Sequence, residues 1–142
     1  MRTIVAPLGS EVEAQLTGLD AQVARVARRY IRRLWLEPYL GVPIARGLLC
    51  EHGCRRVYFD RDDHPDDVLG ARAGAKRRGD EDLSAGPKFR IVYWVREAPR
   101  AQVRVIRILA VGEGHPRPPR RSAYELALEQ LRRLTRTKET RS

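Results

Sequence analysis

The chain has 142 residues, 42% of them hydrophobic and 32% charged, and a formal net charge of +10 at neutral pH. This length is sufficient for a single domain with one buried core. The positive charge indicates an anionic partner, which is nucleic acid, an acidic protein or a membrane surface. Arginine far outnumbers lysine, which favours bidentate binding of phosphate or carboxylate, although a GC-rich genome produces the same bias.

The sequence also excludes two classes of protein, those that span a membrane and those that are stabilised by a set of disulfides. No apolar stretch approaches the roughly 18 to 20 residues that span a bilayer. The segment from Met1 to Ser10 lacks the extended apolar run of a secretory signal, and two cysteines do not make a disulfide scaffold. We therefore expect a cytoplasmic protein without membrane contact.

The N-terminal third predicts a strand followed by two helices. Arg2 to Ala6 form a short apolar run that ends before a proline. Ser10 precedes two acids and is expected to cap a first helix that ends near Thr17. Asp20 is expected to cap a longer second helix, which Pro38 stops.

The second helix is predicted to bury one stripe and to expose a basic one. Its apolar residues recur at three- and four-residue spacing; they are Val23, Val26, Ala27, Tyr30, Ile31 and Leu34. Arginines take the outer positions; they are Arg25, Arg28, Arg29, Arg32 and Arg33. Such a basic face is suited to binding RNA or is simply solvated.

The middle of the chain predicts a loop, a strand and a long insert. Glycine and proline punctuate residues 37–52, which we expect to be a loop. In the strand from Cys54 to Phe59, Arg56 and Tyr58 face away from Val57. Residues 60–82 are polar, rich in glycine and alanine, and carry a net charge of −3, against +13 for the rest of the chain. This segment reads as an inserted loop, at about 60–86.

The C-terminal half predicts a strand hairpin, a basic loop and a helix. Residues 88–96 alternate, with Phe89, Ile91, Tyr93 and Val95 facing the core and Arg90 on the other face. A turn at 98–100 leads to a strand at 102–111, a loop at 112–121, a helix capped by Ser122, and a polar, frayed tail from residue 135.

These elements predict one α+β domain over residues 1–134. Its N-terminal two-helix hairpin packs on a small, mainly antiparallel sheet with a C-terminal helix. The strand faces gather Arg56, Tyr58 and Arg90 on one concave surface. The loop after the last strand brings further residues to its rim, namely His115, Arg117, Arg120 and Tyr124. A buried strand arginine is costly unless its head reaches solvent or an anion. The alternative is that these are solvent-facing residues of a half-exposed sheet.

Here the chain resembles the RelE/ParE superfamily, the toxins of type II toxin–antitoxin systems. The resemblance rests on an ordered set of segments that covers nearly the whole chain except the insert and the tail. These segments are an N-terminal strand, a helix hairpin broken at TGLD, then GVPIARGLL, CRRVYF, FRIVYWV, ILAVG, a basic loop and AYELALEQL.

In the RelE branch, the resemblance implies a ribosome-dependent endoribonuclease that cleaves messenger RNA and so inhibits translation. The 2′-hydroxyl of the substrate attacks the neighbouring phosphate, which requires proton transfer and cations around the charged intermediate. This chemistry needs no metal and no cofactor. The implied partners are the ribosome with its messenger RNA and a small acidic antitoxin that wraps the basic surface.

The resemblance also implies roles for single residues. Arg90 matches the strand arginine that contacts the scissile phosphate, and Arg56 matches a basic residue on the preceding strand. Tyr124 matches the functional tyrosine near the start of the last helix. His115 is a candidate for proton transfer, the alternative being a polar turn residue. Further RNA-binding candidates are Arg55, Tyr58, Lys88, Arg117, Arg120 and Arg121.

The chain departs from the RelE pattern at two places. Tyr58 stands where RelE has a lysine, which removes a candidate proton acceptor. The residues Gly112-Glu113-Gly114-His115 replace a glycine–basic–arginine cluster, so that the basic side chains fall later in the loop. Two alternatives therefore remain open: a ParE-like inhibitor of DNA gyrase, and a non-catalytic module that binds nucleic acid or protein.

A metal site is the other possibility that the residues raise. Cys50, His52 and Cys54 offer three ligands within five residues. A structural zinc site normally uses four ligands; His64 or His115 could complete the set, but a second ligand pair is missing. We therefore expect buried or free thiols and no metal.

Overall fold

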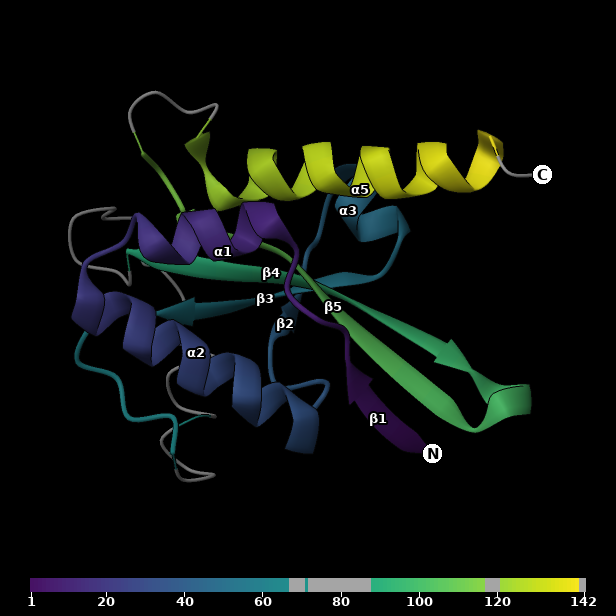
Figure 1. Cartoon of the computed structure of the whole chain (residues 1–142), viewed down its shortest axis with the longest axis horizontal. Helices are drawn as coiled ribbons and strands as arrows, with labels where there is room; N and C mark the ends of the chain where they lie inside the picture. The colour runs from purple at the N-terminus through teal and green to yellow at the C-terminus, as the bar shows by residue number, and fades with distance from the viewer. Residues whose placement is uncertain (67–70, 72–87, 117–120, 141–142) are drawn as a thin grey trace.

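The computed structural model describes residues 1–66, 71, 88–116 and 121–140, with side chains as far as 136. Figure 1 shows its helices and strands. In chain order they are β1 (Arg2–Val5), α1 (Ser10–Thr17), α2 (Ala21–Leu36), β2 (Val42–Pro43), α3 (Gly47–Glu51), β3 (Cys54–Phe59), β4 (Phe89–Ala98), β5 (Val103–Glu113) and α5 (Ala123–Thr140).

The described strands form one five-stranded sheet in the order β1-β5-β4-β3-β2. Strand β1 runs parallel to β5, and the other neighbours are antiparallel. Arg90 lies opposite Tyr58 on one side and Gly112 on the other. The pairing of β4 with β5 shifts after Val92, so that Leu109 is an extra residue in β5. The predicted α+β class and the mainly antiparallel sheet are confirmed.

The sheet is covered by helices on both faces. One core lies between the sheet and the helices α1 and α2, and it holds Phe89, Ile91 and Tyr93 as the alternation predicts. A second core lies on the other face, where Val92 and Trp94 pack with α3 and α5. In Figure 1, α2 and α5 lie on opposite sides of the strands. The apolar stripe of α5 covers the face that carries Arg90, so Arg90 is buried and does not face solvent.

The capping predictions had different outcomes. The side chain of Asp20 accepts a hydrogen bond from the backbone N–H of Gln22, and Ser122 accepts one from that of Glu125, so both are helix caps. Ser10 is not a cap, because the first helical bond runs from the N–H of Glu13 to the carbonyl of Gly9. Gly9 is thus the N-cap, and Ser10 is the first helical residue.

Two further segments differ from the prediction. Residues 37–52, expected to be a loop, contain β2 and α3. Strand β2 can approach β3 because position 41 is a glycine, where a β-carbon would lie 2.6 Å from the carbonyl oxygen of Arg56. Helix α5 continues past Thr135 to Thr140, since no glycine or proline interrupts it.

The predicted insert lies mostly outside the described residues. Its first residues, 60–66, are attached to α2. The hydroxyl of Tyr30 donates to the carboxylate of Asp63 over 3.2 Å, and Arg29 pairs with Asp66. Within the described ranges, no helix is long and apolar enough to cross a membrane.

Candidate functional site

Four polar side chains from three elements meet where β3 and β4 pass under the start of α5. They are Arg56 and Tyr58 of β3, Arg90 of β4 and Tyr124 of α5. The side chain of Arg90 contacts both tyrosines, and that of Arg56 lies over both rings. We call these four residues the arginine–tyrosine cluster. Its members are the strand and helix residues that the sequence predicted to lie together.

Arg90 is the buried centre of the cluster, with 3% of the residue exposed. Its Nε donates to the hydroxyl of Tyr124 over 3.1 Å, and its Nη1 donates to the carbonyl of Phe89 over 2.9 Å. Its Cζ lies 4.3 Å from the centre of the Tyr58 ring, which is within cation–π range. The burial of this guanidinium is thus offset by hydrogen bonds and an aromatic face.

Arg56 supplies the second positive charge of the cluster. Its Cζ lies 5.1 Å from the centre of the Tyr58 ring and 5.7 Å from that of Tyr124. The residue is only partly buried. Its Nε is buried, yet it has no hydrogen-bond partner in the part of the chain that the structure describes. Arg56 therefore has donors available for an anion.

The loop after β5 lies over the cluster at Gly114. The backbone N–H of Gly114 donates to the carbonyl of Lys88 over 2.9 Å, while the side chain of Lys88 pairs with Glu113 at 3.3 Å. His115 is exposed, and no hydrogen bond or ion pair joins it to the cluster among the described residues. Arg121 is also exposed. Arg117 and Arg120 lie outside the described residues.

Arg55 lies apart from the cluster, on the opposite face of β3. Its Nε donates to the carbonyl of Gly41 over 3.0 Å, and its Nη2 donates to that of Tyr39 over 3.2 Å. Its Cζ also lies 5.3 Å from the centre of the Tyr39 ring. These contacts hold the segment before β2 against the sheet. Arg55 was named with the RNA-binding residues, but the structure places it in this contact.

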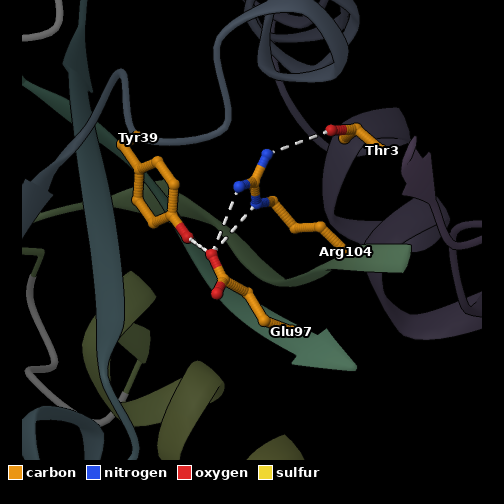
Figure 2. A network of polar contacts seen from close by, with 4 residues as sticks. All are labelled: Thr3, Tyr39, Glu97 and Arg104. Atoms are coloured by element: carbon orange, nitrogen blue, oxygen red, sulfur yellow. Dashed lines mark hydrogen bonds and ion pairs between the residues drawn. The ribbon is translucent and has the colours of Figure 1, made fainter. Parts of the chain in front are cut away.

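A second polar group, shown in Figure 2, joins four segments near the β4–β5 turn. Glu97 accepts hydrogen bonds from the hydroxyl of Tyr39 and from Arg104, and Arg104 also reaches the hydroxyl of Thr3 on β1. The bond to Glu97 raises the pKa of Tyr39, and the same bond lowers the pKa of Glu97. Sequence reasoning missed this group, because these residues lie far apart in the chain and share no motif.

The two cysteines do not point to a metal. Cys50 is exposed, whereas Cys54 is buried, and burial raises the pKa of the Cys54 thiol to about 12. The ring of His52 packs edge-on against Trp94, with ring centres 5.5 Å apart. Among the described residues, no three histidine, cysteine or acidic side chains are grouped as a metal site would need.

The chemistry of the arginine–tyrosine cluster favours a phosphate ligand. It combines two guanidinium groups with two phenol hydroxyls, and arginine binds phosphate through paired N–H donors. Because the hydroxyl of Tyr124 accepts the N–H of Arg90, its own proton can be donated elsewhere. The cluster can therefore hold a phosphate and present a hydroxyl to it.

Comparison with known proteins gives no relative: no family model, no curated protein and no solved structure matches this chain. What is established is the α+β architecture. Two helices near the N-terminus and α5 near the C-terminus cover a five-stranded, mostly antiparallel sheet.

Proposed function

We propose that this protein is a RelE-like toxin, an endoribonuclease that cleaves messenger RNA on the ribosome in the cytoplasm. The observation that carries the proposal is the hydrogen bond between Arg90 and Tyr124. The resemblance assigns a role in cleavage to both residues, although 34 positions separate them. Their contact, with Arg56 beside them, supports a common site.

In this proposal Arg56 binds the scissile phosphate, because it is only partly buried and its Nε has no hydrogen-bond partner among the described residues. Arg90 is almost fully buried, so its role in the proposal is indirect. It holds the hydroxyl of Tyr124 in place and adds positive charge beneath the phosphate. The 2′-hydroxyl gives up its proton and its oxygen attacks phosphorus, while the bond to the 5′-oxygen breaks and that oxygen takes up a proton. The products are a 2′,3′-cyclic phosphate and a 5′-hydroxyl. Tyr124 orients the reacting hydroxyl, and His115 on the exposed loop is the candidate for proton transfer.

The test compares Arg90→Ala and Tyr124→Phe with the parent, on induced expression and on programmed ribosomes. Both variants are expected to lose growth inhibition and to cleave messenger RNA much more slowly than the parent. Arg100→Ala is the matched control, since Arg100 is exposed at the far β4–β5 turn. If both site variants remained as toxic as the parent, the assignment of the site would be wrong.

The two alternatives predict different results. A gyrase inhibitor would trigger a DNA-damage response and leave messenger RNA intact at first. A non-catalytic binding module would bind RNA with strong salt dependence and would not cleave it when ribosomes are present. Measuring messenger RNA length soon after induction separates both from the proposed endoribonuclease.

The implied partner is an acidic antitoxin, and the end of α2 offers a surface for it. Trp35 and Leu36 are 58% and 65% exposed. Next to them, a groove of about 300 Å³ is lined by Val5, Ile31, Arg32 and Trp35. Apolar side chains beside arginines favour a partner segment that alternates apolar and acidic residues. Arg32→Glu is therefore expected to weaken neutralisation by the antitoxin without weakening toxicity.

A further inference from the structure

We propose that Gly114 is a positioning residue, whose missing side chain keeps the Arg90 guanidinium against the hydroxyl of Tyr124. A β-carbon at position 114 would lie 2.9 Å from Cζ of Arg90, 3.0 Å from its Nε and 3.1 Å from its Nη2. The backbone of Gly114 does not have a positive φ. Glycine is therefore needed here for space and not for an unusual backbone conformation.

The backbone at Gly114 has little freedom to move away. Its N–H donates to the carbonyl of Lys88 over 2.9 Å, which continues the β4–β5 pairing one step beyond Phe89 and Glu113. The residue is itself buried. Lifting the loop to admit a side chain would break this end of the sheet.

The guanidinium cannot give way without cost either. The tip of an arginine usually moves easily, but that of Arg90 is held by Tyr124, by the carbonyl of Phe89 and by the face of Tyr58. A methyl group at position 114 would displace Nε from the hydroxyl of Tyr124. The expected effect on cleavage rests on the proposed function, whereas the expected effect on Arg90 rests on the geometry alone.

The experiment compares Gly114→Ala with Gly112→Ala. Gly112 is the matched control, because a β-carbon there meets nothing within 4 Å. The first readout is the NMR signal of the Arg90 Nε–H group, assigned by its loss in Arg90→Lys. We expect this signal to shift or to broaden in Gly114→Ala and to stay in place in Gly112→Ala. The second readout is cleavage, expected to fall about 100-fold in Gly114→Ala, since misplacement by ~1 Å has such an effect.

A double-mutant cycle shows whether Gly114 acts through the Arg90–Tyr124 contact. When Tyr124→Phe has already removed the hydroxyl, Gly114→Ala is expected to slow cleavage by less than about twofold more. An equal loss in both backgrounds would overturn the inference. An unchanged Arg90 signal in Gly114→Ala would overturn it too, even if the parent protein cleaves RNA.

One further outcome separates this inference from the proposed function. If the Arg90 signal changes as expected but the parent does not cleave RNA, only the proposed function fails. If Gly114→Ala does not fold, it is paired with Arg90→Ala, which removes Nε, Cζ and both Nη atoms and leaves room for the new methyl group. The pair is expected to fold, and equal instability of the single and double variants would refute the contact as the cause.

Discussion

The Nε of Arg90 donates a hydrogen bond to the hydroxyl of Tyr124 across the gap between β4 and α5. This bond uses one lone pair of the phenol oxygen and leaves its proton free to point away from the guanidinium. Arg90 is covered and Arg56 is only partly so. In the proposed function this difference assigns phosphate binding to Arg56 and the positioning of Tyr124 to Arg90.

Alanine substitution is expected to weaken RNA binding at Arg56 and to lower the stability of the fold at its neighbour Arg55. If Arg56 contacts a phosphate as proposed, Arg56→Ala should lower the affinity for RNA. The slope of log affinity against log salt concentration should also become shallower by about one. Arg55→Ala removes hydrogen bonds to two carbonyls and should lower the free energy of unfolding by about 1–3 kcal/mol. Salt titrations of RNA binding and urea unfolding measure the two effects. Loss of RNA affinity in Arg55→Ala alone would contradict this assignment.

Gly41→Ala is expected to destabilise the protein by a clash with the backbone of β3. The new β-carbon would lie 2.6 Å from the carbonyl oxygen of Arg56 and 2.9 Å from the ring of Tyr93. Forcing β2 away from β3 should cost about 1–3 kcal/mol, as overpacking does elsewhere. Urea unfolding measures this loss, and Gly112→Ala is the control. Equal stability of the two variants would show that β2 adjusts freely.

The two thiols should differ sharply in reactivity. Cys50 is exposed, whereas burial raises the pKa of Cys54 to about 12. Because the thiolate is the reacting species, Cys54 should be inert at neutral pH while the protein is folded. Labelling with an aromatic disulfide should therefore show one fast thiol and a second only after denaturation. In Cys50→Ser the fast reaction should be absent, and a fast reaction in that variant would contradict the burial of Cys54.

Glu97 should contribute to stability in a pH-dependent way. The hydrogen bond from Tyr39 lowers its pKa in the folded protein, with Arg104 acting in the same direction. Its contribution is therefore complete above the pKa of the unfolded chain, about 4.3, and is lost as the pH falls through the folded value.

The measurement is the free energy of unfolding of the parent and of Glu97→Gln at about pH 7 and about pH 3. The difference between the two proteins should be largest at neutral pH and should shrink in acid. Glu129→Gln is the control, since Glu129 is exposed on α5. A difference that grows in acid would contradict the predicted direction.

Much of the fold could be predicted from local pattern. The spacing of apolar residues located α2, and strict alternation located β4 with Phe89 and Ile91 on the core face. Asp20 and Ser122 were predicted as caps because their chemistry is local. The segment with β2 and α3 was missed, since its glycines and prolines are equally typical of a loop.

The sequence predicted which residues lie together in the arginine–tyrosine cluster, but not that Arg90 is buried. Alternation placed Arg56, Tyr58 and Arg90 on one face, and this was confirmed. The same face of β4 carries Val92 and Trp94, which was a signal that a helix covers it. The fit of Gly114 over Arg90 depends on the register of two strands and on a loop, so no local pattern could have revealed it.

The pairing of β1 with β5 has a consequence for biosynthesis. Residues Arg2 to Val5 are made about a hundred residues before their partners in the sheet, Val103 to Ile106. Strand β5 also takes an interior place in the sheet, between β1 and β4. A nascent chain that stops before Val103 has neither this central strand nor the helix that carries Tyr124. The arginine–tyrosine cluster therefore cannot assemble until α5 has been made, long after the strand that carries Arg56.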